Sequence, residues 1–210
     1  MAPRLRLGPV IVALTLGLVG LGVAACSEDS TAGTEAVAVG GTFQFHSPGG
    51  ETDIFYAEDE RSPVENISGP SLLGDDTVSL DDYEGQIVVL NAWGQWCAPC
   101  RSESDDLQEV HEYLESLGTE SDPVGTVLGI NVRDYSQDIA QDFVKDNGIT
   151  YPSIYDPPFK TAANLGGVPA AVIPTTIVLD AQHRPAAVFL REITADDLIG
   201  VIDDLQAAQT

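Results

Sequence analysis

Two cysteines three positions apart, Cys97 and Cys100, constrain this chain more than any other feature of its sequence. They follow a mostly apolar run, 86–93, that is typical of a buried central strand, and they precede a segment whose apolar residues have helical spacing. The dithiol is therefore predicted to lie where a strand ends and a helix begins. At a helix N-terminus the free backbone N–H groups favour negative charge, so we expect the pKa of Cys97 to lie below the ~8.5 of a free cysteine.

This placement predicts different roles for the two thiols. Cys97 is expected to be the attacking nucleophile. Cys100, one turn further into the helix and expected to be less exposed, can then attack a mixed disulfide at Cys97 and release the partner as a thiol. The pair is predicted to cycle between a dithiol and a Cys97–Cys100 disulfide.

A cysteine pair can also bind a metal or form a purely structural disulfide. A zinc site needs about four ligands, but the only other cysteine is Cys26 and the three histidines are scattered along the chain. No metal site is therefore expected. A purely structural disulfide that closes so short a loop would restrict the unfolded chain little, which favours a redox-active disulfide that works without any other cofactor.

The motif Trp96-Cys97-Ala98-Pro99-Cys100-Arg101, preceded by a lead-in at 79–85, resembles the thioredoxin superfamily and most closely its membrane-anchored TlpA/ResA-type reductases. The resemblance runs from about residue 78 to the C-terminus. It implies an α/β thioredoxin fold with a central mixed sheet flanked by helices, and a thiol-disulfide oxidoreductase activity. Reductases of this type keep apocytochrome c thiols reduced before haem attachment. Their electrons come from a membrane thiol transporter of the CcdA/DsbD type.

The N-terminal residues predict the compartment. Arg4 and Arg6 precede an apolar run that ends at Ala25, as in a secretory signal peptide spanning residues 1–25. Val-Ala-Ala-Cys at its end resembles a bacterial lipobox, which implies a lipidated Cys26 at the mature N-terminus. The alternative is an uncleaved transmembrane helix. Either way the domain is expected at the extracytoplasmic face of the cell membrane, and the lipobox reading makes it lipid-anchored.

Residues 26–41 are small and polar and are predicted to be a flexible tether. Residues 42–77 are predicted to be an N-terminal extension, made of a β-hairpin with arms at 42–46 and 52–56 followed by a polar connection. The extension is expected to add edge strands to the central sheet. Residues 78–210 are predicted to be the thioredoxin-like domain. The formal net charge of −24 argues against nucleic acid as a partner.

Glu103 is predicted to be a proton shuttle for Cys100. It lies on the apolar stripe of the helix that opens at Cys97, in line with Leu107, Val110, Leu114 and Leu117. Its side chain should lean back toward the Cys100 turn, and burial there would raise its pKa. The alternative is an exposed glutamate near a helix N-terminus. The TlpA/ResA-type pattern also carries a glutamate at this position, but the following Ser104-Asp105 departs from it.

Further along, the apolar spacing predicts the remaining elements of a parallel unit and a closing hairpin. The predicted strands are 126–132, 151–155, 177–180 and an edge strand 186–190, and the predicted helices are 136–147, 160–165 and a last helix with the apolar face Leu198, Val201, Ile202 and Leu205.

Pro174 matches a proline that is cis in the thioredoxin superfamily. The resemblance implies that it lies against the dithiol and leaves the backbone of Ile173 free to pair with an incoming substrate strand. Trp96, beside Cys97, is expected to form part of the same docking surface. Trp93 is expected to pack in the core.

The direction of electron flow cannot be read from Ala98-Pro99. We expect a reductase that acts on disulfides of apocytochrome c or other exported proteins. One alternative is a disulfide oxidase or isomerase, or a thiol peroxidase. The other is a non-catalytic lipoprotein that uses the fold for binding, although such a module needs neither Cys97 nor Cys100 at a helix start.

Overall fold

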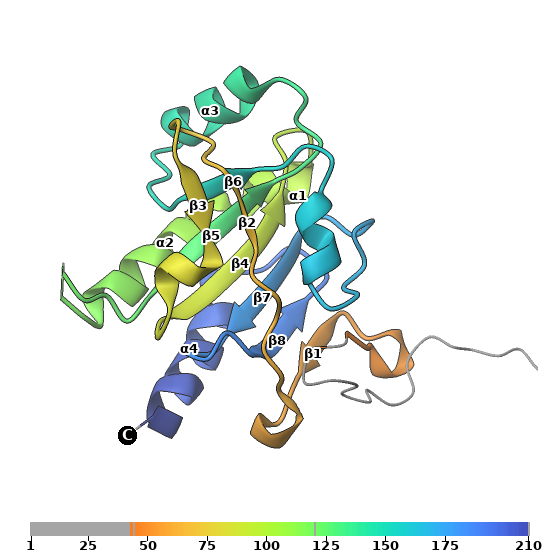
Figure 1. Cartoon of the computed structure of the whole chain (residues 1–210), viewed down its shortest axis with the longest axis vertical. Helices are drawn as coiled ribbons and strands as arrows, with labels where there is room; N and C mark the ends of the chain where they lie inside the picture. Colours follow the sequence, from red (N-terminus) through yellow and green to blue (C-terminus); the bar gives the residue numbers. More distant parts are fainter. Residues whose placement is uncertain (1–42, 44, 120, 210) are drawn as a thin grey trace, which may run out of the picture. The chain divides into compact units, whose positions relative to one another are not determined.

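The computed structural model describes residues 43, 45–119 and 121–209 as an α/β domain built on one central sheet (Figure 1). The predicted signal peptide (1–25) and the tether with Cys26 (26–41) lie outside the described residues. Within those residues no helix is both long enough and apolar enough to cross a membrane.

The central sheet has six strands and is mixed. In spatial order it consists of β1 (Asp53–Phe55), β8 (Pro185–Phe189), β7 (Thr175–Leu179), β4 (Ile87–Trp93), β5 (Gly125–Asn131) and β6 (Ser153–Tyr155). The strands β4, β5 and β6 are parallel to one another, whereas β7, β8 and β1 join by antiparallel pairing. The predicted fold class, a mixed sheet flanked by helices, is confirmed.

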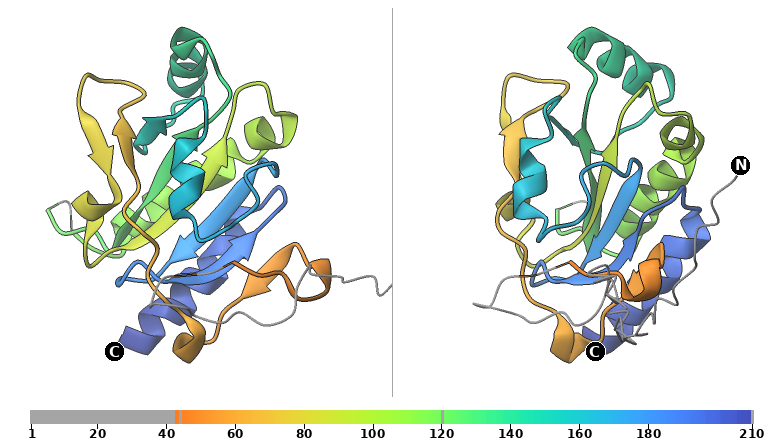
Figure 2. Two further views of the ribbon diagram at one scale, coloured as in Figure 1. Left: turned by 45° about the vertical axis from the view of Figure 1, so that its right-hand side comes forward. Right: turned by 90° about the vertical axis from the view of Figure 1, so that its right-hand side faces the viewer.

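Helices and a small second sheet cover the two faces of this sheet (Figure 2). The α-helices are α1 (Ala98–Ser102), α2 (Ser104–Ser116), α3 (Gln137–Asp146) and α4 (Ala195–Gln209), and the short 3-10 helices are η1 (Pro48–Gly50), η2 (Glu58–Glu60), η3 (Leu80–Tyr83) and η4 (Lys160–Asn164). One face packs against α2 and α4, with α3 in the same core cluster. The other packs against η4 and the two-stranded sheet β2 (Ser68–Pro70) and β3 (Thr77–Ser79).

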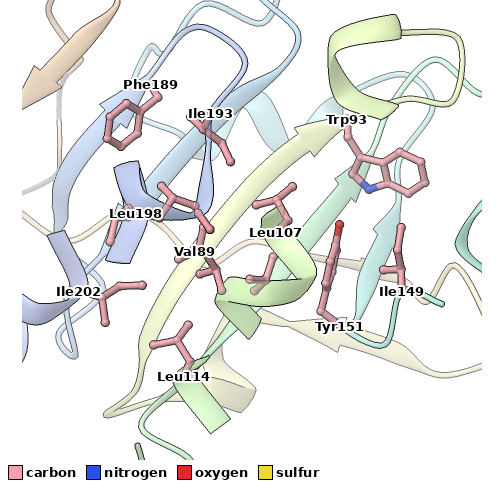
Figure 3. Packing of buried hydrophobic residues seen from close by; sticks show 14 of the residues in the cluster. Val89, Trp93, Leu107, Leu114, Ile149, Tyr151, Phe189, Ile193, Leu198 and Ile202 are labelled. Carbon is pink, nitrogen blue, oxygen red and sulfur yellow. The ribbon is translucent and has the colours of Figure 1, made fainter. Parts of the chain in front are cut away.

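The central strand β4 shows how the sequence divides the core. All seven of its residues are buried, and alternate side chains point to opposite faces. Val89 and Trp93 pack in the cluster with α2, whereas Val88 and Leu90 pack on the other side. Figure 3 shows Leu107 and Leu114 of α2 against this strand. Asn91 lies two residues from both Val89 and Trp93, so its side chain points to the same face of the sheet. This face packs against the helices that follow the dithiol.

The predicted N-terminal hairpin is not formed. Its second arm becomes β1, which pairs antiparallel with β8 rather than with residues 43 and 45–46. The extension thereby adds an edge strand to the central sheet, as predicted. The edge of β8 offers unpaired backbone N–H and C=O groups, with which the distant β1 can form hydrogen bonds. Phe43 is not in a strand and packs edge-to-face on Tyr56, with 5.3 Å between the ring centroids. The hairpin of the extension is β2–β3, in the stretch that was predicted to be a polar connection. Because β1 covers it, β8 is not the edge strand that was predicted.

The helix that was predicted to run on from Cys97 is divided into α1 and α2 at Glu103. The hydroxyl of Ser104 donates to the carbonyl oxygen of Arg101 at 2.9 Å, a local bond that competes with helical pairing. Leu117 was predicted on the buried stripe, but it is 37% exposed because α2 ends at Ser116. Leu107, Val110 and Leu114 are buried as predicted.

Candidate active site

Cys97 and Cys100 are joined by a disulfide at the carboxyl end of β4, where α1 begins. Cys97 is the N-cap residue of α1, and the backbone N–H of Cys100 donates to its sulfur at 3.2 Å. After reduction this N–H favours a thiolate at Cys97. Because α1 has only five residues, the stabilisation comes from this local donor rather than from a long helix dipole. Cys97 and Cys100 are 4% and 3% exposed, so the predicted difference in exposure is small in the disulfide form.

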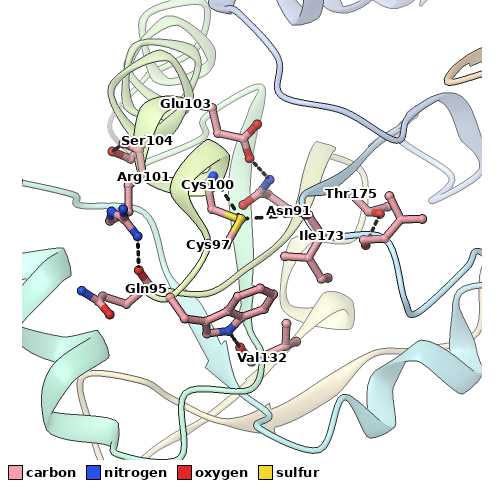
Figure 4. The surroundings of a disulfide bond; sticks show 12 residues. Asn91, Gln95, Cys97, Cys100, Arg101, Glu103, Ser104, Val132, Ile173 and Thr175 are labelled. Carbon is pink, nitrogen blue, oxygen red and sulfur yellow. Dashed lines mark hydrogen bonds between the residues drawn. A yellow bond between two sulfur atoms is a disulfide. The ribbon is translucent and has the colours of Figure 1, made fainter.

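The Ile173–Pro174 peptide bond is cis, as the resemblance implied. The carbonyl oxygen of Ile173 lies 3.8 Å from the sulfur of Cys97 (Figure 4). In the disulfide that sulfur carries no proton, so the contact is not a hydrogen bond there. Pro174 is buried and Ile173 is half-buried. A segment 76 residues away in sequence is thereby placed directly against the reactive sulfur.

Trp96 lies next to Cys97 and is exposed, with 45% of its surface accessible to solvent. Its indole N–H donates to the carbonyl oxygen of Val132 at 3.0 Å. The preceding residue is held as well, because the backbone N–H of Gln95 donates to Asp134 at 2.7 Å. Trp93 is buried, as expected of a core residue. The turn before the dithiol is therefore fixed by the loop that follows β5.

Glu103 is completely buried in the surroundings of the disulfide, as the apolar stripe predicted (Figure 4). One carboxylate oxygen accepts from the side-chain amide of Asn91 at 2.9 Å, and the other accepts from the backbone N–H of Ile193 at 3.1 Å. Burial raises the pKa of Glu103 to about 7, although both hydrogen bonds lower it. The carboxyl group therefore exists in both protonation states near neutral pH, which suits a group that takes up and releases a proton.

Sequence reasoning missed three residues around the dithiol. Asn91 was noted only as differing from the acidic residue of cytosolic thioredoxins, yet its amide bridges Glu103 and Thr176. Asp134 holds both Gln95 and Asn131. Arg133 lies over the Trp96 ring. A signal for the last two was available, because they follow β5 and the carboxyl ends of adjacent parallel strands meet at one edge of a sheet.

The comparisons with known proteins agree with this geometry. Residues 62–184 match the model of the AhpC/TSA family. The thiol-disulfide oxidoreductase ResA of Geobacillus thermodenitrificans is 28% identical over 119 residues, which are 57% of this chain and 63% of that protein. The match thus spans less than two thirds of this relative's length.

Two solved structures are much more similar. The crystal structure of a DsbF homologue from Corynebacterium diphtheriae is 76% identical, covers 78% of this chain and 99% of its own, and has a TM-score of 0.73. A secreted thiol-disulfide isomerase from Corynebacterium glutamicum is 68% identical, with coverages of 79% and 98% and a TM-score of 0.76. With a family match over more than half of its length and the fold and cysteine pair of a thiol-disulfide oxidoreductase, this chain belongs to the AhpC/TSA family, within the thioredoxin superfamily.

Proposed function

We propose that this protein is an extracytoplasmic thiol-disulfide oxidoreductase that reduces disulfides in exported proteins through Cys97 and Cys100. The observation that carries the proposal is the arrangement of three groups in the surroundings of the disulfide. The N–H of Cys100 donates to Cys97, the carbonyl of Ile173 lies beside it, and Glu103 is buried in the same surroundings. A structural disulfide requires neither a buried carboxyl group with a pKa of about 7 nor an adjoining docking segment.

The reaction begins from the reduced dithiol. The Cys97 thiolate attacks one sulfur of the substrate disulfide, a new sulfur–sulfur bond forms at Cys97, and the other substrate sulfur leaves as a thiolate that takes a proton from water. Cys100 then loses its proton and attacks the Cys97 sulfur. The Cys97–Cys100 disulfide forms and the second substrate thiol leaves, so that two electrons have passed to the substrate.

Glu103 supplies the base for the second half of this exchange. Its carboxylate accepts the Cys100 proton, directly or through water, and later returns it to solvent or to the leaving thiolate. Asn91 and the N–H of Ile193 support the charged form that must exist before the proton arrives. Without these two donors, burial alone would keep the group protonated and inactive as a base.

Substrate docking involves the residues that lie beside Cys97. The backbone of Ile173, held ahead of Pro174, pairs with an extended substrate strand, and Trp96 supplies an apolar surface for its side chains. Thr175 orients this segment, because its hydroxyl donates to the carbonyl oxygen of Val172 at 2.8 Å. Contact through backbone atoms would allow several substrate sequences to be accepted.

The location and partners form part of the same proposal. The lipobox-like sequence ending at Cys26 supports a lipid anchor at the extracytoplasmic face of the cell membrane. The similar thiol-disulfide isomerase from Corynebacterium glutamicum is a secreted protein, which also supports action outside the cytoplasm. By family resemblance, the electron donor is a membrane thiol transporter of the CcdA/DsbD type, and apocytochrome c is one candidate substrate.

A disulfide isomerase is the second candidate, favoured by the description of the 68% identical relative as a thiol-disulfide isomerase. An isomerase also attacks from a reduced Cys97, but it returns the electrons to the same substrate. An isomerase would rearrange a scrambled protein without net consumption of a reductant.

The test combines a potential with a trapping experiment. A reduction potential of the Cys97–Cys100 couple well below that of protein disulfide isomerase, about −180 mV, is expected for a reductase. A potential well above that value would refute the reductive direction. Cys97→Ser should abolish exchange, whereas Cys100→Ser should accumulate mixed disulfides whose partners, identified by mass spectrometry, name the substrates. Exchange by Cys97→Ser at the wild-type rate would refute catalysis by this pair.

A further inference from the structure

Two arginines are attached to the Gln95-Trp96 segment that precedes Cys97. Seven of the nine Lys and Arg residues of this acidic chain lie in the described part: Arg61, Arg101, Arg133, Lys145, Lys160, Arg184 and Arg191. Arg61, Arg184 and Arg191 form ion pairs with carboxylates. Within residues 43, 45–119 and 121–209, Arg101 and Arg133 form none and bind backbone carbonyl groups instead.

Arg133 bridges the two sides of the candidate docking surface. Its guanidinium carbon lies 5.7 Å from the centroid of the Trp96 ring, and one of its nitrogens donates to the carbonyl oxygen of Ala170 at 2.7 Å. Ala170 belongs to the exposed loop that leads to Ile173 and Pro174. The backbone of Arg133 has a φ of 61°, which is uncommon for a residue other than glycine. A left-handed backbone and two side-chain contacts thus hold one cation between Trp96 and the loop that carries the cis proline.

Arg101 lies on the other side of the same segment in sequence. It directly follows Cys100, is exposed, and donates to the carbonyl oxygen of Gln95 at 2.7 Å (Figure 4). An arginine has five N–H donors, so one bond to a carbonyl leaves most of them available at both residues. The remaining N–H groups can donate to a carboxylate in the bidentate geometry that guanidinium groups favour.

The nearby carboxylates do not neutralise these cations. Asp134 is buried and accepts from Gln95 and Asn131. Asp105, four residues after Arg101, is exposed and forms no ion pair with it. Acids on the surface beyond ~8 Å are largely screened, so they offset these two cations little. Arg101 and Arg133 therefore place two cations without an ion-pair partner among the described residues beside the segment that precedes Cys97, although the chain carries a net charge of −24.

We propose that Arg133, stacked on Trp96 and supported by Arg101, makes this enzyme prefer polypeptides with an Asp or Glu next to the reacting cysteine. The proposal rests on the proposed function and adds its substrate class. The substrate strand would pair with the backbone near Ile173, and its acidic side chain would meet the guanidinium of Arg133. Arg133 would thereby determine specificity without touching the sulfur atoms.

The test uses two peptide disulfides that differ at one residue beside the cysteine, Glu in one and Lys in the other. The kcat/KM of the reduced enzyme should be about 5–10-fold higher for the Glu peptide. Arg133→Gln keeps a long polar side chain but removes the charge, and the ratio should fall to about 1. Lys145→Gln, which removes an exposed cation on α3, is the matched control and should keep the wild-type ratio.

Because a ratio is compared, a general loss of rate in Arg133→Gln cancels. An equal rate with both peptides in the wild type, or an unchanged ratio in Arg133→Gln, would overturn the proposal. Exchange with uncharged hydroxyethyl disulfide separates the two levels of inference. If the wild type exchanges with it but shows no peptide preference, only the specificity is wrong. If it does not exchange, the oxidoreductase function and the specificity both fail.

Discussion

The side-chain amide of Asn91 donates a 2.9 Å hydrogen bond to the carboxylate of Glu103, and both residues have 0% exposure. Asn91 lies in the middle of β4, and Glu103 lies at the junction of α1 and α2. The bond favours the charged carboxylate, whereas burial favours the neutral acid and is the larger effect. Their opposition leaves the pKa of Glu103 at about 7, where a proton shuttle can work in both directions.

Removing this donor should move the working pH range of the enzyme upward. In Asn91→Leu, a substitution of similar size, the charged form of Glu103 loses one hydrogen bond and its pKa should rise by about 1 unit. The pH midpoint for resolution of a Cys97 mixed disulfide should rise equally in stopped-flow measurements. Thr176→Val is the control, because it removes the other acceptor of the same amide and leaves the carboxylate contact in place. An unshifted midpoint in Asn91→Leu would show that Glu103 does not set it.

Replacing the carboxyl group itself should slow the attack by Cys100. Glu103→Gln keeps the shape of the side chain but cannot take up the proton, so the resolving step should slow by up to ~10²-fold near pH 7. The first attack by Cys97 should change much less. Single-turnover kinetics against pH separates the two steps. Asp105→Asn, an exposed neighbour, should behave as wild type, and a wild-type pH profile in Glu103→Gln would exclude the shuttle role.

The surroundings of Glu103 show which part of the site could be predicted from sequence. Its burial follows from helical spacing, which depends only on residues within a few turns. Its partners do not follow, because the Ile193 amide is 90 residues away and the Asn91 contact requires the packing of α1 against β4. The cis bond before Pro174 was expected from resemblance alone, since most X–Pro bonds are trans.

Strand pairing shows the same division between local and distant information. The alternation at 52–56 correctly predicted an extended segment, and β1 occupies residues 53–55. The expected addition of an edge strand to the central sheet is confirmed, because β1 lies at its edge. The hairpin pairing with 42–46 was predicted wrongly because a turn signal at 47–50 favours the nearest strand. In the structure Asp53 faces Phe189 across the ladder, and the ion pair between Asp53 and Arg191 strengthens that choice. Neither contact leaves a pattern in the local sequence.

The buried carboxyl group should also make folding stability depend on pH. The pKa of Glu103 is raised from 4.5 to about 7, so the folded state binds the proton more tightly than the unfolded state. This stabilising contribution is complete below pH 4.5 and is lost as pH rises through 7. The loss corresponds to roughly 3 kcal/mol in the free energy of unfolding.

Urea unfolding of the disulfide form checks this, because the cysteines do not titrate in that form. The difference in the free energy of unfolding between wild type and Glu103→Gln should change by roughly 2–3 kcal/mol between pH 5 and pH 8. Relative to the variant, wild type should be less stable at pH 8 than at pH 5. Other titrating groups cancel in the difference. A difference that is constant over this range would show that the carboxyl group is hydrated rather than buried.

Arg191 should hold the edge strand β1 and helix α4 onto the sheet. Its guanidinium donates to both oxygens of Asp53 at 2.7 Å and to Asp197 at 3.0 and 3.2 Å. The three side chains are 28–36% exposed, so solvent screening weakens the network. We expect Arg191→Met to lower the free energy of unfolding by ~1 kcal/mol.

The effect of this substitution should be local and should disappear in acid. Hydrogen exchange in Arg191→Met should speed up at residues 53–55, while Lys145→Met, which breaks no ion pair within the described residues, should exchange as wild type. The Arg191 hydrogen bonds lower the pKa of Asp197 from 3.8 to about 2, so this stabilisation is present above pH 3.8 and is lost as pH falls through 2. The stabilities of wild type and Arg191→Met should therefore converge below pH 2. A difference that persists there would indicate packing of the Arg191 stem on Phe189, 5.5 Å from the guanidinium, as the main contribution.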